Sequence, residues 1–191
     1  MNYILYWIVK IFGTPIFYLL FWPKYKGKNN IPKGVPVILA GNHKSNFDCA
    51  FLVTSTNRVI HFLAKKELLD SKMKLFFKGM GIIPVDRKNK NPKALEDATK
   101  CLNNNGVIGI FPEGTTNKTN KLLMPFKYGA VSMAKKTDAY IVPFAINGKY
   151  KIFGGLTITF GKPYKVKNEL EEENKILMNK VSELMRGVYN E

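Results

Sequence analysis

The chain has 191 residues, of which 46% are hydrophobic, so its composition predicts one domain with a packed core and excludes a disordered chain. It carries 30 basic and 14 acidic residues, and this net charge of +16 favours a polyanionic partner: nucleic acid, anionic lipid, or an acidic or phosphorylated substrate. Cys49 and Cys101 are far apart in the sequence, which indicates reduced thiols, and with only two histidines in the chain no Cys/His metal site is expected.

The first 28 residues are rich in aromatic and aliphatic side chains and turn basic between residues 24 and 28. They lack the small-residue cleavage site of a secretory signal peptide. Gly13 and Pro15 predict a break in the helix, and Lys10 interrupts the apolar run, so we expect two short helices. These helices are expected to lie in one leaflet of a membrane, entered from the cytoplasmic side, with the lysines at the lipid phosphates. The alternatives are two core helices of a soluble protein and a single tilted span.

Short apolar runs, which predict strands, follow this segment. They span residues 35–40, 59–64, 81–85, 106–111, 139–146 and 156–160. The first five are almost continuously apolar, as in strands buried on both faces, whereas the last alternates, as an edge strand does. Helices are expected between and after them, at 46–55, 67–79, 91–104, 127–136 and 168–186. This alternation predicts that residues 29–191 form an α/β domain, a mostly parallel sheet flanked by helices, preceded by the separate membrane-associating segment 1–28.

Polar clusters follow several of the predicted strands. They are the stretches 41–48, 84–87 and 111–116. In a parallel sheet, ligands bind beyond the carboxyl ends of the strands. The sequence therefore predicts that the three clusters meet on one rim of the sheet.

The first cluster, "GNHKSNFD", holds His43 and, five residues later, Asp48. If the chain is helical from about residue 45, the carboxylate lies one turn on and can face the imidazole. Such a pair can take a proton from a substrate hydroxyl, because the carboxylate fixes the tautomer and stabilises the imidazolium. The alternative is a hydrogen bond at a helix start, with Ser45 and Asn46 as caps.

The other clusters are less specific by themselves. Arg87, just past a strand, has the forked donors that suit a phosphate, or it forms a salt bridge with Asp86. "FPEGTT" places Glu113 in what is either a ligand site or an ordinary turn. Lys127 stands at a helix start, where a solvated lysine is the usual case.

Taken in order, the motifs resemble those of the 1-acylglycerol-3-phosphate acyltransferases, also called lysophosphatidic acid acyltransferases. "NHKSNFD" (42–48) fits their NHxxxxD motif, and "GIIPVDR" (81–87) fits a glycine-led strand that ends in a basic residue. "FPEGTTN" (111–117) corresponds to a third motif, usually FPEGTRS, and "IVPFAI" (141–146) to a fourth. The resemblance covers roughly residues 30–165.

The resemblance implies acyl transfer from a thioester, of acyl carrier protein or coenzyme A, to the sn-2 hydroxyl of 1-acylglycerol 3-phosphate, giving phosphatidic acid in phospholipid synthesis. His43 is implied as the general base and Asp48 as the residue that orients it. The residues implied to hold the acceptor are Arg87, Glu113, Gly114, Thr115 and Lys127. Neither a cofactor nor a metal nor a covalent enzyme intermediate is implied.

One departure concerns the third motif, where the family's arginine is Thr116 here. A second phosphate contact would have to come from Lys118, Lys121 or Lys127. Glycerol 3-phosphate and lysophospholipids with larger headgroups therefore stay open as acceptors. A basic module without catalysis, bound to membrane or nucleic acid, is the alternative of another class. The aromatic residues gather at the N-terminus among apolar neighbours, which favours lipid over nucleic acid.

Overall fold

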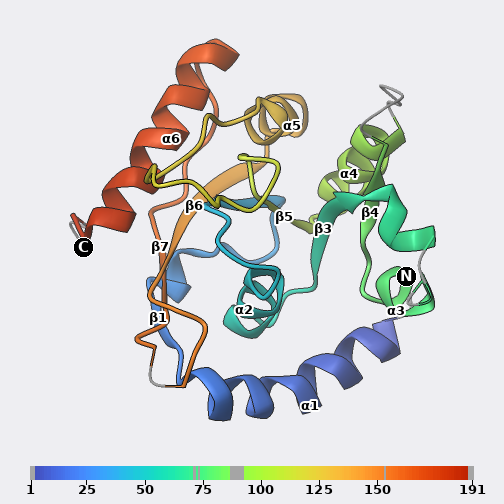
Figure 1. Cartoon of the computed structure of the whole chain (residues 1–191). Coiled ribbons are helices and arrows are strands. Elements are labelled where there is room, and N and C mark those ends of the chain that lie inside the picture. Colours follow the sequence, from blue (N-terminus) through green and yellow to red (C-terminus); the bar gives the residue numbers. More distant parts are fainter. Residues whose placement is uncertain (1–2, 71, 73, 87–92, 153, 189–191) are drawn as a thin grey trace.

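The computed structural model describes residues 3–70, 72, 74–86, 93–152 and 154–188 (Figure 1). Within these residues, seven strands form one sheet in the order β1-β7-β6-β2-β5-β3-β4. The strands are β1 (Lys24–Lys26), β2 (Val37–Gly41), β3 (Ile60–Lys65), β4 (Ile83–Val85), β5 (Val107–Ile110), β6 (Tyr140–Asn147) and β7 (Thr157–Phe160). All neighbouring strands run parallel except β6 and β7, which are antiparallel. The predicted α/β fold with a mostly parallel sheet is confirmed.

The edge of the sheet differs from the prediction. β7 was expected at the edge, and this is wrong, because β7 lies between β6 and β1. β1 comes from the basic stretch expected at lipid phosphates, and it pairs in parallel with β7. Lys24 and Lys26 are exposed on this new edge, while the Tyr25 hydroxyl between them hydrogen-bonds Thr54 Oγ1 at 2.6 Å. The contact of Tyr25 with α2 therefore helps to hold β1 against β7, although the other two residues of β1 are lysines.

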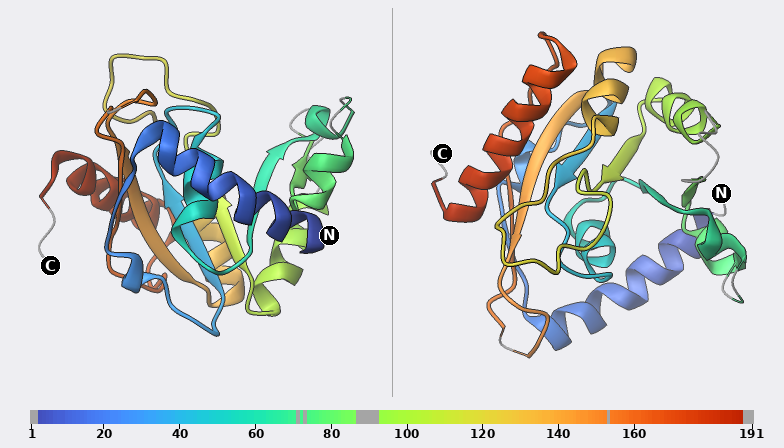
Figure 2. Two further views of the ribbon diagram at one scale, coloured as in Figure 1. Left: turned by 90° about the horizontal axis from the view of Figure 1, so that it is seen from below. Right: turned by 45° about the horizontal axis from the view of Figure 1, so that its top comes forward.

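Helices cover both faces of the sheet (Figure 2). The helices are α1 (Tyr3–Phe21), α2 (Asp48–Ser55), α3 (Lys74–Gly79), α4 (Lys93–Asn103), α5 (Gly129–Thr137) and α6 (Leu170–Arg186), with 3-10 turns η1 (Lys28–Asn30) and η2 (Lys66–Asp70). Successive strand residues face opposite sides, so Leu39 packs with α1 and α2, and Ile38 packs with α4, α5 and α6. Both side chains are fully buried, which explains why the central strands are continuously apolar.

The expected break of the N-terminal helix is wrong. α1 is continuous from Tyr3 to Phe21 and contains Pro15. Tyr6, before the proline, and Phe17, after it, are both buried in the core that α1 shares with α2. Packing on both sides of Pro15 therefore offsets the hydrogen bond that a proline removes from a helix.

Lys10 lies on the protein-facing side of α1 rather than in lipid. It is 9% exposed, donates to the backbone carbonyl of Thr56 just after α2, and has its Nζ 4.9 Å from the centre of the Trp7 ring. The Tyr6 hydroxyl accepts from the Ile60 N–H at 3.1 Å, which ties the same face to β3. The polar groups of α1 thus dock the helix on the domain.

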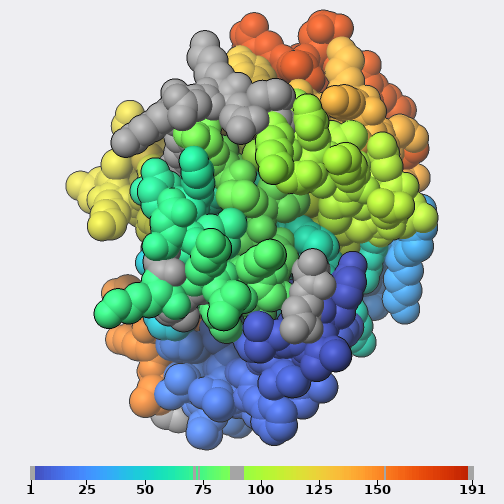
Figure 3. Space-filling model, turned by 90° about the vertical axis from the view of Figure 1, so that its right-hand side faces the viewer, coloured from blue at the N-terminus to red at the C-terminus, as the bar shows by residue number. Residues whose placement is uncertain are grey.

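The opposite face of α1 is apolar and exposed. Its side chains include Ile4, Ile8, Ile11, Phe12, Ile16 and Leu19. α1 is long and apolar enough to cross a membrane by length and composition alone. α3 lies beside its N-terminal half, with Gly79 against Leu5, and the two elements share one surface of the molecule (Figure 3).

The remaining helices lie close to their expected ranges. The helix expected at 46–55 begins at Asp48, and the one expected at 67–79 is divided into η2 and α3. The expected start of α4, at residues 91–92, lies outside the described residues. α5 and α6 begin two residues later than expected.

Candidate active site

The site begins where β2 ends, at Gly41. The next residue, Asn42, is 2% exposed, and its amide bonds both backbone groups of Ile146: Oδ1 accepts from the N–H at 2.7 Å and Nδ2 donates to the carbonyl at 3.0 Å. The side chain thereby continues the pairing of β2 with β6 by one residue. This anchor fixes the direction in which the following histidine leaves the sheet.

His43 and Asp48 form a hydrogen-bonded pair. His43 Nδ1 lies 2.7 Å from Asp48 Oδ2, with the imidazole 16% exposed and the carboxylate fully buried. An ionised carboxylate would accept this bond from Nδ1–H, which leaves Nε2 as the ring nitrogen that the pair does not use. The predicted pairing of these two residues is confirmed.

The pairing does not arise from helical spacing, however. α2 begins at Asp48 itself, and the intervening residues form a turn. Asp48 Oδ2 accepts the backbone N–H of Lys44 at 2.6 Å and of Ser45 at 2.9 Å, so the carboxylate folds the chain back toward the histidine. Neither Ser45 nor Asn46 is the N-cap, which is Phe47 without a side-chain bond.

The His43 ring is stacked on Phe111, which follows β5, with ring centres 4.1 Å apart and planes at 15°. This contact holds the imidazole flat against the adjacent strand.

Burial, and then the neighbouring Asp48 carboxylate, raise the pKa of the Cys49 thiol to about 12. The thiol therefore stays protonated at neutral pH and is a poor nucleophile.

Glu113 joins the first and third motifs. It is 5% exposed, and its oxygens accept from the His43 N–H at 2.8 Å and the Met124 N–H at 2.9 Å. The Asn117 N–H donates to the His43 carbonyl at 2.8 Å, so both backbone groups of His43 are bonded to the segment after β5. In Figure 1 this segment is the long loop between β5 and α5. Glu113 thus holds the backbone of His43 directly, whereas its expected contact with the acceptor stays a prediction.

Gly114 and Lys127 lie together at the turn after Glu113. Gly114 has a φ of 73°, and a Cβ there would meet Lys127 Nζ at 2.8 Å. A side chain at this position would therefore be both strained and crowded. Thr115 and Lys127 are exposed, and neither lines the hollow beside the dyad.

A hollow of about 200 Å³ opens beside the dyad. Its lining residues are His43, Lys44, Glu113, Asn117, Thr119, Lys121, Leu122 and Met185. Glu113 brings one negative charge, although its oxygens accept from backbone N–H groups, whereas Lys44 and Lys121 bring two positive charges. The hollow therefore favours an anion.

Side-chain bonds shape the loop that carries Lys121. Asn117 Nδ2 donates to the Lys121 carbonyl at 3.0 Å, and Asn117 Oδ1 accepts from the Thr119 N–H at 2.9 Å. Of the three lysines considered for a second phosphate contact, Lys121 lines the hollow, whereas Lys118 and Lys127 do not. Lys44 also lines the hollow, and the sequence gives no distinct signal for it, because an exposed lysine beside a histidine is common.

The second motif contains β4, which is separated from β5 by β3. Asp86, just past this strand, has its Oδ2 3.6 Å from Lys66 Nζ. Arg87 lies outside the described residues, so its predicted role as a phosphate ligand stays a prediction.

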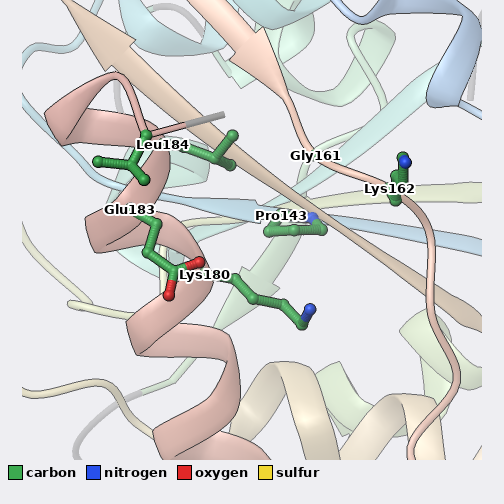
Figure 4. A pocket seen from close by; sticks show the side chains of 7 residues that line it. Pro143, Gly161, Lys162, Lys180, Glu183 and Leu184 are labelled. Carbon is green, nitrogen blue, oxygen red and sulfur yellow. The ribbon is translucent and has the colours of Figure 1, made fainter. Parts of the chain in front are cut away.

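A larger hollow, of about 300 Å³, lies between the middle of β6, the segment just after β7 and the C-terminal part of α6 (Figure 4). Its charged side chains are Lys162, Lys180 and Glu183, with Pro143 and Leu184 as apolar walls. Neither member of the dyad lines it, whereas His43 lines the smaller hollow.

The chain is similar to known acyltransferases. Residues 23–147 match the family described as Acyltransferase. A 1-acyl-sn-glycerol-3-phosphate acyltransferase of Bacillus subtilis is 35% identical over 127 residues, which make up 65% of this chain and 62% of that protein. One of Borreliella burgdorferi is 33% identical over 130 residues, 66% of this chain and 52% of that protein. The chain thus spans less than two thirds of either relative.

A solved structure extends the similarity to almost the whole chain. The crystal structure of the 1-acyl-sn-glycerophosphate (LPA) acyltransferase PlsC from Thermotoga maritima matches with a TM-score of 0.78 at 25% identity. The match covers 97% of this chain and 78% of that one. Since the family match covers most of the chain and includes both members of the dyad, the chain belongs to the acyltransferase family.

Proposed function

We propose that this protein transfers a fatty acyl group from a thioester to the free hydroxyl of 1-acylglycerol 3-phosphate, giving phosphatidic acid. The observation that carries the proposal is the His43–Asp48 dyad, which opens into a hollow that bears lysine side chains. The named relatives support the choice of acceptor. The donor is proposed as a thioester of acyl carrier protein or coenzyme A, both of which are anionic and suit a chain of charge +16.

The proposed reaction is direct transfer. His43 Nε2 takes the proton of the acceptor hydroxyl as its oxygen attacks the thioester carbonyl carbon. Asp48 stabilises the imidazolium that forms. When the tetrahedral intermediate collapses, the carbon–sulfur bond breaks and the imidazolium returns the proton to the leaving thiolate. The acceptor oxygen now carries the acyl group as an ester, the donor leaves as a free thiol, and His43 is again neutral.

The acceptor phosphate is proposed to bind at Lys44 and Lys121, which line the hollow beside His43. An ammonium group can approach a phosphate from several directions, so two lysines can replace one forked arginine at some loss of geometry. By resemblance, Arg87 is proposed as a further phosphate ligand, and Glu113 and Gly114 are proposed to shape the turn beside the hollow. Thr115 and Lys127 do not line the hollow, so any contact that they make with the acceptor would lie outside it.

The assay that tests the function offers the purified full chain both donors in turn. The acceptors are lysophosphatidic acid, glycerol 3-phosphate, lysophosphatidylcholine and monoacylglycerol. We expect transfer to lysophosphatidic acid and little to monoacylglycerol, which lacks the phosphate. Preference for glycerol 3-phosphate or lysophosphatidylcholine would replace the proposed acceptor, and no transfer with any pair would reject the proposal.

Replacing Lys121 with alanine is expected to raise the acceptor KM about 10-fold, the loss typical of one hydrogen bond to a charged group. The KM for the acyl donor should change little, because the lysine is proposed to contact the phosphate alone. Lys118→Ala is the matched control, since it removes the same charge from the same loop outside the hollow. Equal effects of the two substitutions would mean that the loop acts only through its overall charge.

We propose further that the protein lies on the cytoplasmic face of the membrane without crossing it. One side of α1 is buried against the domain, through Tyr6, Lys10 and Phe17, so the whole helix cannot be surrounded by lipid. Its other side exposes large apolar residues, and basic residues follow in β1, as suits an anionic interface.

Leu19→Glu is expected to weaken binding to vesicles of anionic phospholipid at least about 10-fold, because Leu19 is 78% exposed and would enter the lipid. Val188→Glu, on α6's side of the molecule at 61% exposure, is the control and should bind as the wild type does. Vesicle flotation measures both. Deletion of α1 is a poor test, since it would uncover the core around Tyr6 and Phe17. Unchanged flotation of Leu19→Glu would exclude this face as the membrane contact.

A further inference from the structure

Tyr150 reaches the dyad from a distant part of the chain. It lies in the connection between β6 and β7, about a hundred residues beyond the first motif. Its hydroxyl donates a hydrogen bond of 2.5 Å to Asp48 Oδ1. The sequence carries no local sign of this role, because nothing in the stretch around Tyr150 resembles a motif.

The phenol completes the set of bonds around the buried carboxylate. His43 Nδ1 and the N–H groups of Lys44 and Ser45 all approach Oδ2, whereas Tyr150 approaches Oδ1. Donors on both oxygens prevent the carboxylate from rotating about its χ2 bond. Burial, and then the charge of Asp48, raise the pKa of Tyr150, so the phenol keeps its proton across the working range of pH.

The Tyr150 ring packs against two other aromatic rings. It lies edge-on to Phe21, with ring centres 5.5 Å apart, and beside Phe47 at 5.8 Å. Phe21 is the last residue of α1, and Phe47 directly precedes Asp48. The end of the N-terminal helix therefore packs against the side chain that holds the dyad.

We propose that Tyr150 is a positioning residue of the dyad, which fixes the Asp48 carboxylate and limits its pull on the His43 proton, and that Phe21 holds Tyr150 in place. The proposal deepens the proposed function, on which its catalytic consequence rests. Its effect on the imidazole does not depend on which substrate is used.

Loss of the phenol has a predictable direction. Without the bond at Oδ1, more negative charge remains on Oδ2, and the carboxylate stabilises the imidazolium more strongly. His43 then keeps its proton to higher pH and acts as a base over a narrower range. The titratable groups that face the dyad, and that the variants leave unchanged, are Cys49, Glu113, Lys44 and Lys121.

The test compares Tyr150→Phe with Tyr25→Phe in the full chain. Tyr25 is a matched control, because its hydroxyl is also bonded on α2, to Thr54, but does not touch Asp48. The first readout is carbethoxylation of His43 as a function of pH, followed by peptide mass spectrometry, since this reagent reacts with neutral imidazole. His61, the second histidine of the chain, is the internal reference. The second readout is the pH profile of acyl transfer.

In Tyr150→Phe we expect the His43 carbethoxylation curve to move to higher pH by about half a unit to one unit. The acidic limb of the rate profile should move by the same amount, and kcat should fall about 10-fold with little change in KM. Phe21→Ala should reproduce both shifts in part, and Tyr25→Phe should show neither.

An unchanged His43 curve in Tyr150→Phe would overturn the proposal, even if activity fell, because the tyrosine would then be only a structural support. An unchanged curve in Phe21→Ala would remove α1 from it. If the curve shifts while the wild type shows no transfer with any tested substrate, the role of Tyr150 stands and the proposed function fails.

Discussion

Replacing His43 with alanine is expected to lower the rate of acyl transfer about 10²- to 10⁴-fold, the usual contribution of a general base. His43 Nε2 is the ring nitrogen not bonded to Asp48, and it opens toward the hollow where the acceptor is proposed to bind. The substitution should leave the fold intact, since the imidazole is partly exposed and the structural bonds of this residue are made by its backbone. The measurement is the initial rate at saturating substrate, with circular dichroism to confirm folding.

His61→Gln is the control for His43→Ala. His61 lies in β3, where its Nδ1 is 3.0 Å from the Gly81 carbonyl, away from the hollow. It should retain activity within a few-fold of the wild type. If His43→Ala stays folded and also remains within a few-fold, the histidine takes no part in the chemistry and the direct-transfer mechanism has to be abandoned.

Asp48→Asn is expected to cost about 10³-fold or more in rate, because a neutral amide cannot stabilise the imidazolium. It should also lower thermal stability, since the buried carboxylate accepts the N–H groups of Lys44 and Ser45 that shape the turn. Asp138→Asn is a matched control: the same change of charge is made at an exposed aspartate whose φ of 51° asparagine tolerates.

Both quantities are measured on the same preparations, the rate by acyl transfer and the stability by thermal unfolding. A stable Asp48→Asn variant with a normal rate would mean that the carboxylate serves neither the turn nor the base. A variant with lower stability but a normal rate would leave Asp48 as a support of the turn alone.

Much of the fold could be predicted because burial leaves a local signature. β2, β5 and β6 lie in the middle of the sheet with both faces covered, so their residues must be apolar throughout. The dyad was predictable for a related reason: in "NHKSNFD" both partners belong to one turn, and the pairing needs only a few residues of chain.

What the sequence could not determine depends on contacts between distant residues. Pro15 locally predicts a broken helix. Tyr6 and Phe17, on either side of it, are buried in one core, and this packing keeps α1 continuous across the proline. The alternation in β7 indicated an edge strand, but the placement of Tyr25 against α2 brought β1 alongside it. In both cases tertiary packing contributes more to the stability of the observed structure than the local conformational preference does.

The sequence by itself determined the parallel α/β core, the His43–Asp48 pair and the resemblance of the ordered motifs. Only the tertiary structure decided that Glu113 accepts from the backbone N–H of His43 and that Lys44 and Lys121 line the hollow. The same is true of the hydrogen bond that the Tyr150 hydroxyl donates to the Asp48 carboxylate. The physical reason is that a strand or a turn is specified by neighbours along the chain, whereas the partner of a buried polar group is specified by whichever distant segment the fold brings within hydrogen-bonding distance.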